Sequence, residues 1–152
     1  MVTLVPADFF NPAAAREALA EVAEIGESEI VKYVSLPQFG AVLIYSITGG
    51  EDENSLPELF YLLRDIESCT EYNRIFASYR DGLLNLVIAQ GKSLLLANEF
   101  KARDFTTAEY FIFLSMKSLQ LNPEVSTICW RTPLSAEDEM SLYRYFKGVE
   151  QL

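Results

Sequence analysis

The first sixty residues alternate between apolar and polar blocks in an order that predicts strand, helix, strand, strand, helix. The strands are predicted at residues 2–5, 29–36 and 39–48. The third strand is apolar on both faces at its centre, a pattern typical of a strand covered on both sides. The polar run GGEDEN at 49–54 follows it and is the predicted internal boundary.

Local capping signals predict where the two helices of this half begin. Asn11 and Pro12 open the first, because Asn is a good N-cap and Pro at the first helical position loses no useful donor. Gly26 is placed to end that helix. The second is predicted from a capping box, in which Ser55 accepts a free backbone N–H and Glu58 reaches back.

The second half begins with a predicted three-stranded antiparallel meander. Its strands are expected at 72–79, 83–89 and 93–100. Asp81 and Gly82 form the first turn, because both residue types tolerate the positive φ of tight hairpins. A second turn is predicted at 90–92.

The meander is followed by a predicted helix, strand and helix. Thr106 and Glu109 match a capping box, and the helix they open is apolar nearly all round, so we expect it to be largely buried. A strand is predicted at 125–130. Ser135 opens a last helix, which Gly148 ends. The order β-β-β-α-β-α predicts a mixed sheet with helices on its faces, an α/β fold.

Composition narrows the chemistry that this chain can perform. It has 152 residues, half of them hydrophobic, and no histidine. The lack of histidine excludes Ser-His-Asp and Cys-His catalysis and His-ligated zinc within this chain. Cys69 and Cys129 lack a metal-binding spacing, and reduced thiols are favoured over a bridge. Too few carboxylates lie near the meander (Glu71, Asp81 and Glu99) for a metal-dependent nuclease.

The net charge of −10 repels phosphate backbones and anionic lipid, so no nucleic-acid or membrane partner is expected. The N-terminus lacks a basic segment and a long apolar run, and no stretch approaches the ~20 apolar residues of a spanning helix. We therefore expect a cytoplasmic protein. The acidic run of Glu51, Asp52 and Glu53 is interpreted as a solvated loop in preference to a cation site.

The order β-β-β-α-β-α is that of the ribonuclease-H-like unit, two of which build the actin and Hsp70 fold. Residues 79–121 resemble the second-domain hairpin and helix of actin-type pilus-assembly and cell-division proteins. The phrase LVPADFF at 4–10, and Asn98 with Thr106 and Tyr110, are similar to motifs of a bacterial family of uncharacterised proteins with an actin-like ATPase fold. The likeness runs from Leu4 to about Lys147.

This resemblance implies a domain organisation. Residues 1–50 would form a partial first ribonuclease-H-like unit, and residues 51–152 the second unit. The first half of the chain, which includes the helix predicted from Ser55, has the order β-α-β-β-α. The opening strands of the first unit would then be absent. A truncated protein, a natural short form and an expressed fragment all fit this expectation.

The resemblance also points to Mg-ATP, and here the sequence departs from the nucleotide-binding pattern. Members that bind nucleotide carry small hydroxylated residues after an Asp-x-Gly turn, where amides and hydroxyls hold phosphate. In this chain Leu83 and Leu84 follow Asp81 and Gly82. ATP hydrolysis by this chain alone is not expected, and neither is a cofactor or a metal.

The candidate ligand-binding residues are Asp81, Gly82, Asn98, Arg103 and Thr106. The first two would be a remnant phosphate turn, although an ordinary hairpin turn is favoured. The other three lie where a strand passes to a helix N-terminus, which can hold an anion. The favoured alternative there is that Thr106 caps its own helix.

Three functions remain open from the sequence. The leading hypothesis is a non-catalytic interaction or scaffold protein with a degenerate actin-like fold, which binds a protein partner or self-associates. The alternative is a nucleotide-dependent ATPase or kinase-like protein that acts through a dimer or a missing half. A small-ligand domain with a pocket near Asn98 to Thr106 is the third. The aromatic side chains of Trp130, Tyr143, Tyr145 and Phe146 fit either a partner-binding patch or the core.

Overall fold

The computed structural model describes residues 1–52 and 54–152, which divide into two compact units, Met1–Phe60 and Tyr61–Leu152. Glu53, the last residue of the acidic loop discussed above, lies outside the described residues. The boundary between the two units falls within the helix Glu58–Asp65. The assignment of residues 1–50 and 51–152 to two ribonuclease-H-like units stays a prediction.

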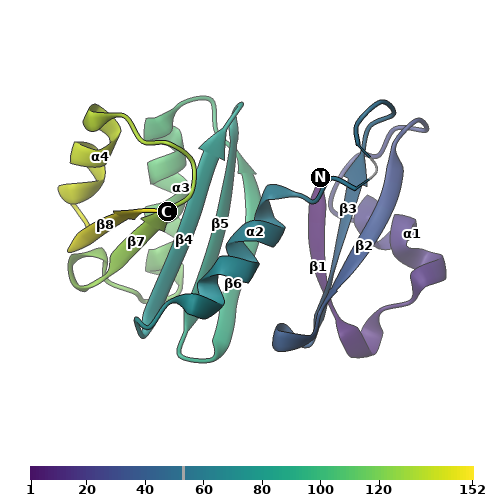
Figure 1. Cartoon of the computed structure of the whole chain (residues 1–152), viewed down its shortest axis with the longest axis horizontal. Helices are drawn as coiled ribbons and strands as arrows, with labels where there is room; N and C mark the ends of the chain where they lie inside the picture. The colour runs from purple at the N-terminus through teal and green to yellow at the C-terminus, as the bar shows by residue number, and fades with distance from the viewer. Residues whose placement is uncertain (53) are drawn as a thin grey trace. The chain divides into compact units, whose positions relative to one another are not determined.

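Figure 1 shows the elements in chain order. The strands are β1 (Val2–Pro6), β2 (Ile30–Leu36), β3 (Ala41–Ile47), β4 (Asn73–Arg80), β5 (Leu83–Gln90), β6 (Ser93–Lys101), β7 (Thr127–Trp130) and β8 (Gly148–Gln151). The α-helices are α1 (Ala15–Ala20), α2 (Glu58–Asp65), α3 (Phe105–Ser118) and α4 (Ala136–Tyr143). Short 3₁₀ turns lie at Ala7–Phe9, Pro12–Ala14, Pro37–Phe39, Ile66–Ser68 and Pro123–Val125.

In the first unit, β1 and β2 both pair with β3 in an antiparallel sheet of order β1-β3-β2. Leu19 of α1 packs against Val42 and Ile44 on one face of β3. Leu43 and Tyr45, which point to the other face, are buried as well. The prediction that this strand is covered on both sides is therefore confirmed.

Helix α1 is shorter than the sequence predicts. The Asn11 side chain caps, as expected, but it accepts from the N–H of Ala13 at 3.1 Å and opens a 3₁₀ turn ahead of α1. The helix then ends at Ala20 and does not continue to Gly26. The guanidinium of Arg16 donates to the carbonyls of Gly26 and Glu29 at 2.8 and 2.9 Å, which holds the chain in a folded-back loop in place of a further helical turn.

The second unit contains a five-stranded sheet of order β6-β5-β4-β7-β8. Strands β4, β5 and β6 form the predicted antiparallel meander, and β7 pairs with β4 in parallel after the α3 crossover. Strand β8, parallel to β7, was not predicted. It begins at Gly148, where the sequence placed the end of the last helix, whereas α4 ends at Tyr143.

Helices cover both faces of this sheet (Figure 1). Helices α3 and α4 pack on one face, in a core that includes Leu86, Ile112, Trp130 and Leu142. The Tyr61–Asp65 part of α2 lies over the other face, where the Arg131 guanidinium stands 4.4 Å from the centre of the Tyr61 ring. No helix among residues 1–52 and 54–152 is long and apolar enough to cross a membrane.

Helix α2 begins later than the predicted capping box requires. With Ser55 as the cap, Leu56 would be the first helical residue, but the helix begins at Glu58. Pro57 supplies the reason, because the residue before a proline is driven away from helical backbone angles. Leu56 is therefore kept out of the helix, and the carbonyl of Pro57 accepts from the N–H of Phe60 at 3.0 Å as the helix begins.

Helix α3 begins two residues earlier than predicted, at Phe105, and its cap is Asp104 and not Thr106. The predicted partner of Thr106 has another role. Glu109 is 6% exposed and its two carboxylate oxygens accept from the Ser141 hydroxyl of α4, at 2.8 and 3.0 Å. Burial raises the pKa of Glu109, while the bond from Ser141 lowers it.

The expectation that α3 is largely buried is wrong for its outer face. Ala108, Ile112 and Met116 are buried against the sheet, at the spacing of one helical face. Tyr110 and Leu114 remain 60% and 48% exposed. Because α3 packs on the sheet through one face, its other apolar side chains reach the surface.

Candidate functional site

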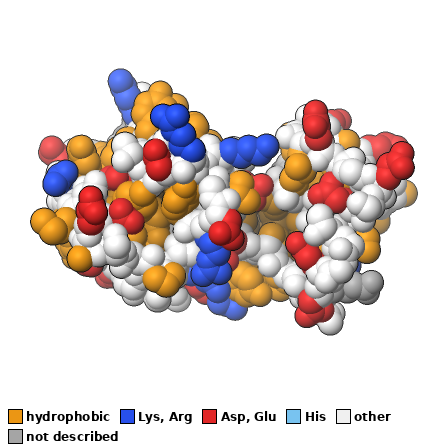
Figure 2. Space-filling model, turned by 90° about the horizontal axis from the view of Figure 1, so that it is seen from above, with side chains coloured by type: hydrophobic (Ala, Val, Ile, Leu, Met, Phe, Trp, Pro, Cys, Tyr) orange, Lys and Arg blue, Asp and Glu red, His pale blue; other side chains and the backbone are white. Residues whose placement is uncertain are grey.

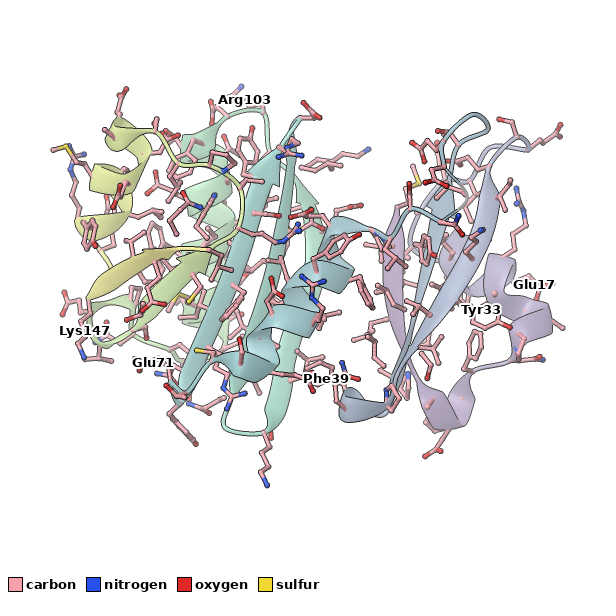
Figure 3. The ribbon with its side chains drawn as sticks, viewed as in Figure 1. Glu17, Tyr33, Phe39, Glu71, Arg103 and Lys147 are labelled. Atoms are coloured by element: carbon pink, nitrogen blue, oxygen red, sulfur yellow. The ribbon has the colours of Figure 1, made fainter. Side chains whose placement is uncertain are left out.

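The turn between β4 and β5 lies beside a groove of about 560 Å³ that we call the turn groove. It is lined by Asp81, Gly82, Leu83, Lys101, Ala102, Arg103, Thr107 and Phe111. Three of the five predicted residues, Asp81, Gly82 and Arg103, therefore lie together. Arg103 is at the opposite end of the sheet from Glu71 and Lys147 (Figure 3).

The turn has the backbone geometry that its sequence predicts. Asp81 and Gly82 have φ values of 51° and 76°, so both lie in the left-handed region, as a two-residue hairpin turn requires. The carbonyl of Gly82 accepts from the N–H of Ala102 at 2.9 Å. The carbonyl of Ala102 accepts from the Tyr79 hydroxyl at 2.6 Å. These bonds hold the turn against the end of β6.

The N-terminus of α3 beside the groove is already capped by a carboxylate. Asp104 Oδ1 accepts from the backbone N–H of Thr107 at 2.7 Å and from its hydroxyl at 2.6 Å. These bonds, with a smaller effect of Arg103, lower the pKa of Asp104. A phosphate approaching this helix end would meet a negative charge, and one of the free helix donors is already bonded.

Asn98 and Thr106 are not among the residues that line the turn groove. Asn98 lies in β6 opposite Leu86, and its side-chain oxygen accepts from the N–H of Glu99 at 2.8 Å. Thr106 is exposed on the first turn of α3. The structure thus brings together only part of the predicted set, and ligand binding by any of its members stays a prediction.

The apolar residues after the turn have a packing role. Leu84 is fully buried in the core beneath α3, and Leu83 pairs with Lys101 at the start of the β5–β6 ladder. Hydroxyl groups at these positions would enlarge the polar surface of the groove, but Leu84 would then leave a gap in the core. The apolar side chain at position 84 is therefore tied to how this sheet packs.

The carboxylates considered for a nuclease do not converge. Glu71 precedes β4 and Asp81 follows it, so the eight residues of the strand, about 26 Å of extended chain, lie between them. Within the described ranges, no group of three or more His, Cys, Asp or Glu side chains is arranged to hold a metal ion.

The two cysteines are free and lie in the second unit. Cys129 of β7 is buried, and its Sγ is 3.7 Å from a carboxylate oxygen of Glu150. Burial raises the pKa of the Cys129 thiol to about 12, and the neighbouring Cys69 and Glu150 add to this effect. A thiol with this pKa is protonated and unreactive at neutral pH.

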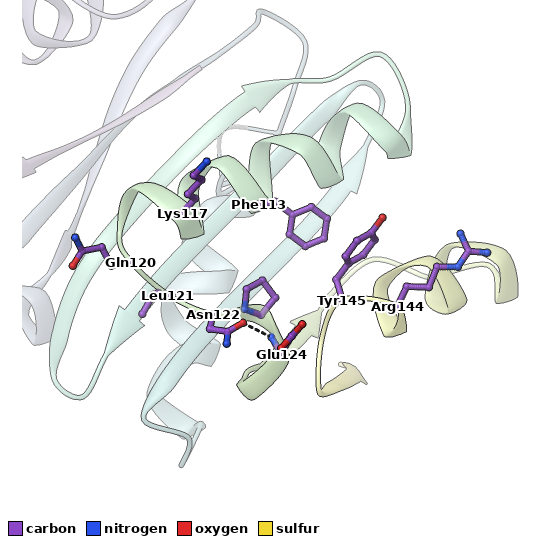
Figure 4. A pocket seen from close by; sticks show the side chains of 9 residues that line it. Phe113, Lys117, Gln120, Leu121, Asn122, Glu124, Arg144 and Tyr145 are labelled. Carbon is purple, nitrogen blue, oxygen red and sulfur yellow. Dashed lines mark hydrogen bonds between the residues drawn. The ribbon is translucent and has the colours of Figure 1, made fainter.

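A second groove, which the sequence did not predict, lies at the other end of α3 and has a volume of about 620 Å³ (Figure 4). We call it the α3 groove. It is lined by Phe113, Lys117, Gln120, Leu121, Asn122, Pro123, Glu124, Arg144 and Tyr145. These residues come from the end of α3, the turn that follows it and the end of α4.

The floor of the α3 groove is built by a tightly bonded chain reversal. Gln120 has a φ of 59°, and the N–H of Leu121 donates to the carbonyl of Met116 at 2.8 Å, the pattern of a Schellman cap. Asn122 Oδ1 then accepts from the N–H of Glu124 at 3.0 Å and opens the next turn (Figure 4). The backbone of the groove is therefore fixed by its own hydrogen bonds.

Aromatic side chains form one wall of this groove. The rings of Phe113 and Tyr145 are 4.7 Å apart and tilted, and Tyr145 is 49% exposed. Figure 2 shows hydrophobic side chains at the surface of the second unit, the left-hand part, among acidic and basic ones. Of the four aromatic residues weighed in the sequence, Trp130 and Phe146 belong to the core, whereas Tyr143 and Tyr145 are exposed.

Comparison with known proteins identifies the family of this chain. A family model with the description "Protein of unknown function (DUF3822)" matches residues 53–149, well over half of the chain. The chain belongs to this family. No curated protein matches it. The DUF3822 match covers the whole meander, both grooves and β7.

The DUF3822 chain is also similar to a solved structure. This is a protein of Bacteroides thetaiotaomicron with an actin-like ATPase fold and unknown function, which matches with a TM-score of 0.79 and 21% identity. The match covers 99% of this chain and 64% of that one. At this identity the likeness shows the fold alone. The predicted resemblance to an uncharacterised family with an actin-like ATPase fold is thereby confirmed, as is the mixed α/β fold class.

Proposed function

We propose that this DUF3822 chain is a non-catalytic binding protein, which uses the actin-like fold to present the α3–α4 face to a protein partner. The observation that carries the proposal is the exposed apolar stripe of α3. Tyr110 and Leu114 lie one helical turn apart on its outer face and lead toward the α3 groove. Together with the exposed ring of Tyr145 in that groove, they give this face several exposed large apolar side chains, and a gathering of such side chains can mark an interaction site.

The chemistry of the turn groove supports the non-catalytic part of the proposal. The carboxylate of Asp104 stands at the N-terminus of α3, and Leu83 and Leu84 replace the hydroxylated residues of a phosphate turn. The net charge of −10 disfavours nucleic acid and anionic lipid as partners. We place the protein in the cytoplasm as part of the same proposal.

A thermal-shift titration with Mg-ATP tests the proposal. Because binding to the folded state raises the unfolding temperature, a non-binding chain should show no shift over a hundredfold range of Mg-ATP. Wild type is compared with Asp81→Ala at the turn and with Asp8→Ala, an exposed carboxylate in the first unit. A saturable rise that Asp81→Ala removes and Asp8→Ala retains would contradict a non-catalytic role.

The second candidate is a nucleotide-dependent ATPase or kinase-like protein that acts through a dimer or a missing half. One observation favours it, because Lys101 and Arg103 line the same groove as the left-handed turn of Asp81 and Gly82. Such a protein requires an assembly that depends on nucleotide. Size-exclusion chromatography with and without Mg-ATP distinguishes the two, since the proposed binding protein should elute at the same volume in both runs.

A further inference from the structure

Resting on the proposed function, we infer that the α3 groove binds a short segment of another protein, in which a large apolar side chain is accompanied by an acidic one. The segment would place its apolar side chain between Phe113 and the Leu121–Pro123 turn. Its carboxylate would lie at the rim beside Lys117, whereas Arg144 lies beyond the rings of Phe113 and Tyr145 (Figure 4).

The shape of the groove suits a side chain of this kind. Its volume of about 620 Å³ is within the range of sites that enclose drug-sized groups, roughly 300–1,000 Å³. Phe113, Leu121, Pro123 and Tyr145 supply an apolar lining, and the Schellman cap at Gln120 fixes the backbone below them. A preformed apolar site costs little ordering of its own when a partner binds.

The charge of the rim selects the sign of the partner. The chain as a whole is strongly acidic, yet the groove carries Lys117 and Arg144 against the single carboxylate of Glu124. Lys117 is exposed and has no ion pair with any described residue. Arg144 also attracts the carboxylate of Glu109, so Lys117 is the cation offered to a partner. Surface charges act over a Debye length of about 8 Å at physiological salt, so a carboxylate bound beside Lys117 responds to that ammonium group more than to the distant acidic residues.

The outer face of α3 gives the segment a direction. Tyr110, Leu114 and Lys117 are spaced at i, i+4 and i+7, which places them along one side of the helix over about 10 Å. A segment anchored in the groove would continue along this side. We therefore expect a second apolar residue, about one or two turns away from the anchor, to contact Leu114 and Tyr110.

A selection of random 12-residue peptides displayed on phage tests this inference on the full chain. Peptides are selected on wild type, and the pool is depleted on Lys117→Glu. The most enriched sequence is synthesised with a fluorescein label, and its Kd is measured by fluorescence anisotropy. We expect enriched peptides to combine aromatic or large aliphatic residues with Asp or Glu.

Two variants and a matched control locate the site. Lys117→Glu should weaken the labelled peptide by about tenfold, because it places like charges together. Leu114→Ser should weaken it less. Lys92→Glu makes the same charge change at the β5–β6 turn, in a residue that does not line the groove, and should leave the Kd unchanged.

The remaining outcomes overturn the inference in distinguishable ways. Peptides that bind equally to wild type, Lys117→Glu and Leu114→Ser would leave the protein-binding function standing and remove this groove as its site. Enrichment of basic peptides would show that the rim does not select an acidic partner. Failure to enrich any peptide would count against both. Sedimentation that shows a wild-type dimer lost in Lys117→Glu would make a second copy of the chain the occupant.

Discussion

The two ends of helix α3 differ in the polar contacts and in the exposed apolar side chains that surround them. At the N-terminal end, Asp104 bonds Thr107 twice, and the turn at Gly82 is bonded to Ala102. At the C-terminal end the backbone is equally well bonded, but the side chains of Phe113 and Tyr145 leave an apolar groove open to solvent. Both ends border a groove, but the N-terminal one lies beside a carboxylate bonded to the helix, whereas the C-terminal one exposes aromatic side chains.

The comparison also bears on the predicted anion site at the turn groove, where ligand binding stays a prediction. The turn groove is lined by the basic side chains of Lys101 and Arg103. The carboxylate of Asp104 caps the helix beside it, and Leu84 belongs to the core. The α3 groove carries the basic side chains of Lys117 and Arg144 and the carboxylate of Glu124 beside apolar walls, and its helix end is capped by backbone hydrogen bonds. Similar charges therefore favour different ligands at the two ends, because their surroundings differ.

The largest effect is expected from the residue that supports both ends. Ile112 is fully buried between the two grooves, so Ile112→Ala should lower the free energy of unfolding by about 3 kcal/mol through lost burial and a cavity. Urea denaturation followed by circular dichroism measures this loss. Leu114→Ala is the matched control two residues away, and it should change stability by less than about 0.5 kcal/mol.

Equal losses for these two variants would contradict the assignment of faces on α3. A large loss for Leu114→Ala would mean that its side chain is covered in the protein in solution. The apolar stripe would then belong to the core, and the contrast between the two ends of the helix would lose its basis.

A smaller effect is expected at the contact between α3 and α4. Burial raises the pKa of Glu109, so the folded state binds its proton more tightly than the unfolded state does. Stability from this group is therefore present below about pH 4.5 and is lost as the pH rises through the folded pKa. Glu109→Gln removes the buried charge and should raise stability at pH 7 by about 1 kcal/mol.

Unfolding temperatures of wild type and Glu109→Gln between pH 4 and pH 8 test this sign. The difference between the two should grow as the pH rises, because only the wild type loses the contribution of the protonated carboxyl. Ser141→Ala serves as a control, since it removes the donor to Glu109 and should destabilise the protein at neutral pH. If Glu109→Gln is less stable than wild type at pH 7, the bonds from Ser141 to the Glu109 carboxylate outweigh the cost of burying its charge.

Most of the fold follows from patterns that are local in sequence. The double-faced apolar run of β3 and the Asp81-Gly82 turn were sufficient to place a covered strand and the meander. Strand β8 was missed because Val149 is its one buried residue, and a four-residue edge strand carries little alternation. The prediction of the α3 cap is wrong because Asp104 and Thr106 are both good capping residues, and the local sequence does not distinguish them. In the folded chain β6 ends at Lys101, and Asp104 is the residue that caps the helix.

The candidate sites divide along the same line. Residues of the turn groove were found because Asp81 and Gly82 are adjacent and carry a turn signal that a sequence shows directly. The α3 groove was missed because Phe113, Pro123 and Tyr145 come from separate segments, and no local spacing connects them. The apolar character of α3 was visible in the sequence. It predicts a largely buried helix, but composition alone does not distinguish a buried helix from one with an exposed apolar face.

The smallest effect is expected at the capped end of α3. Asp104→Ala removes both bonds to Thr107 and should lower the midpoint of thermal unfolding by about 3 °C. These bonds lower the pKa of Asp104, so its contribution is present at neutral pH and is lost as the pH falls below about 4. Asp104→Asn keeps a capping oxygen without the charge and should retain most of the stability while losing that acid dependence. If Asp104→Ala also creates saturable binding of inorganic phosphate that Asp104→Asn lacks, the carboxylate excludes anions by occupying the helix end, and the contrast between the two ends of α3 rests on this one side chain.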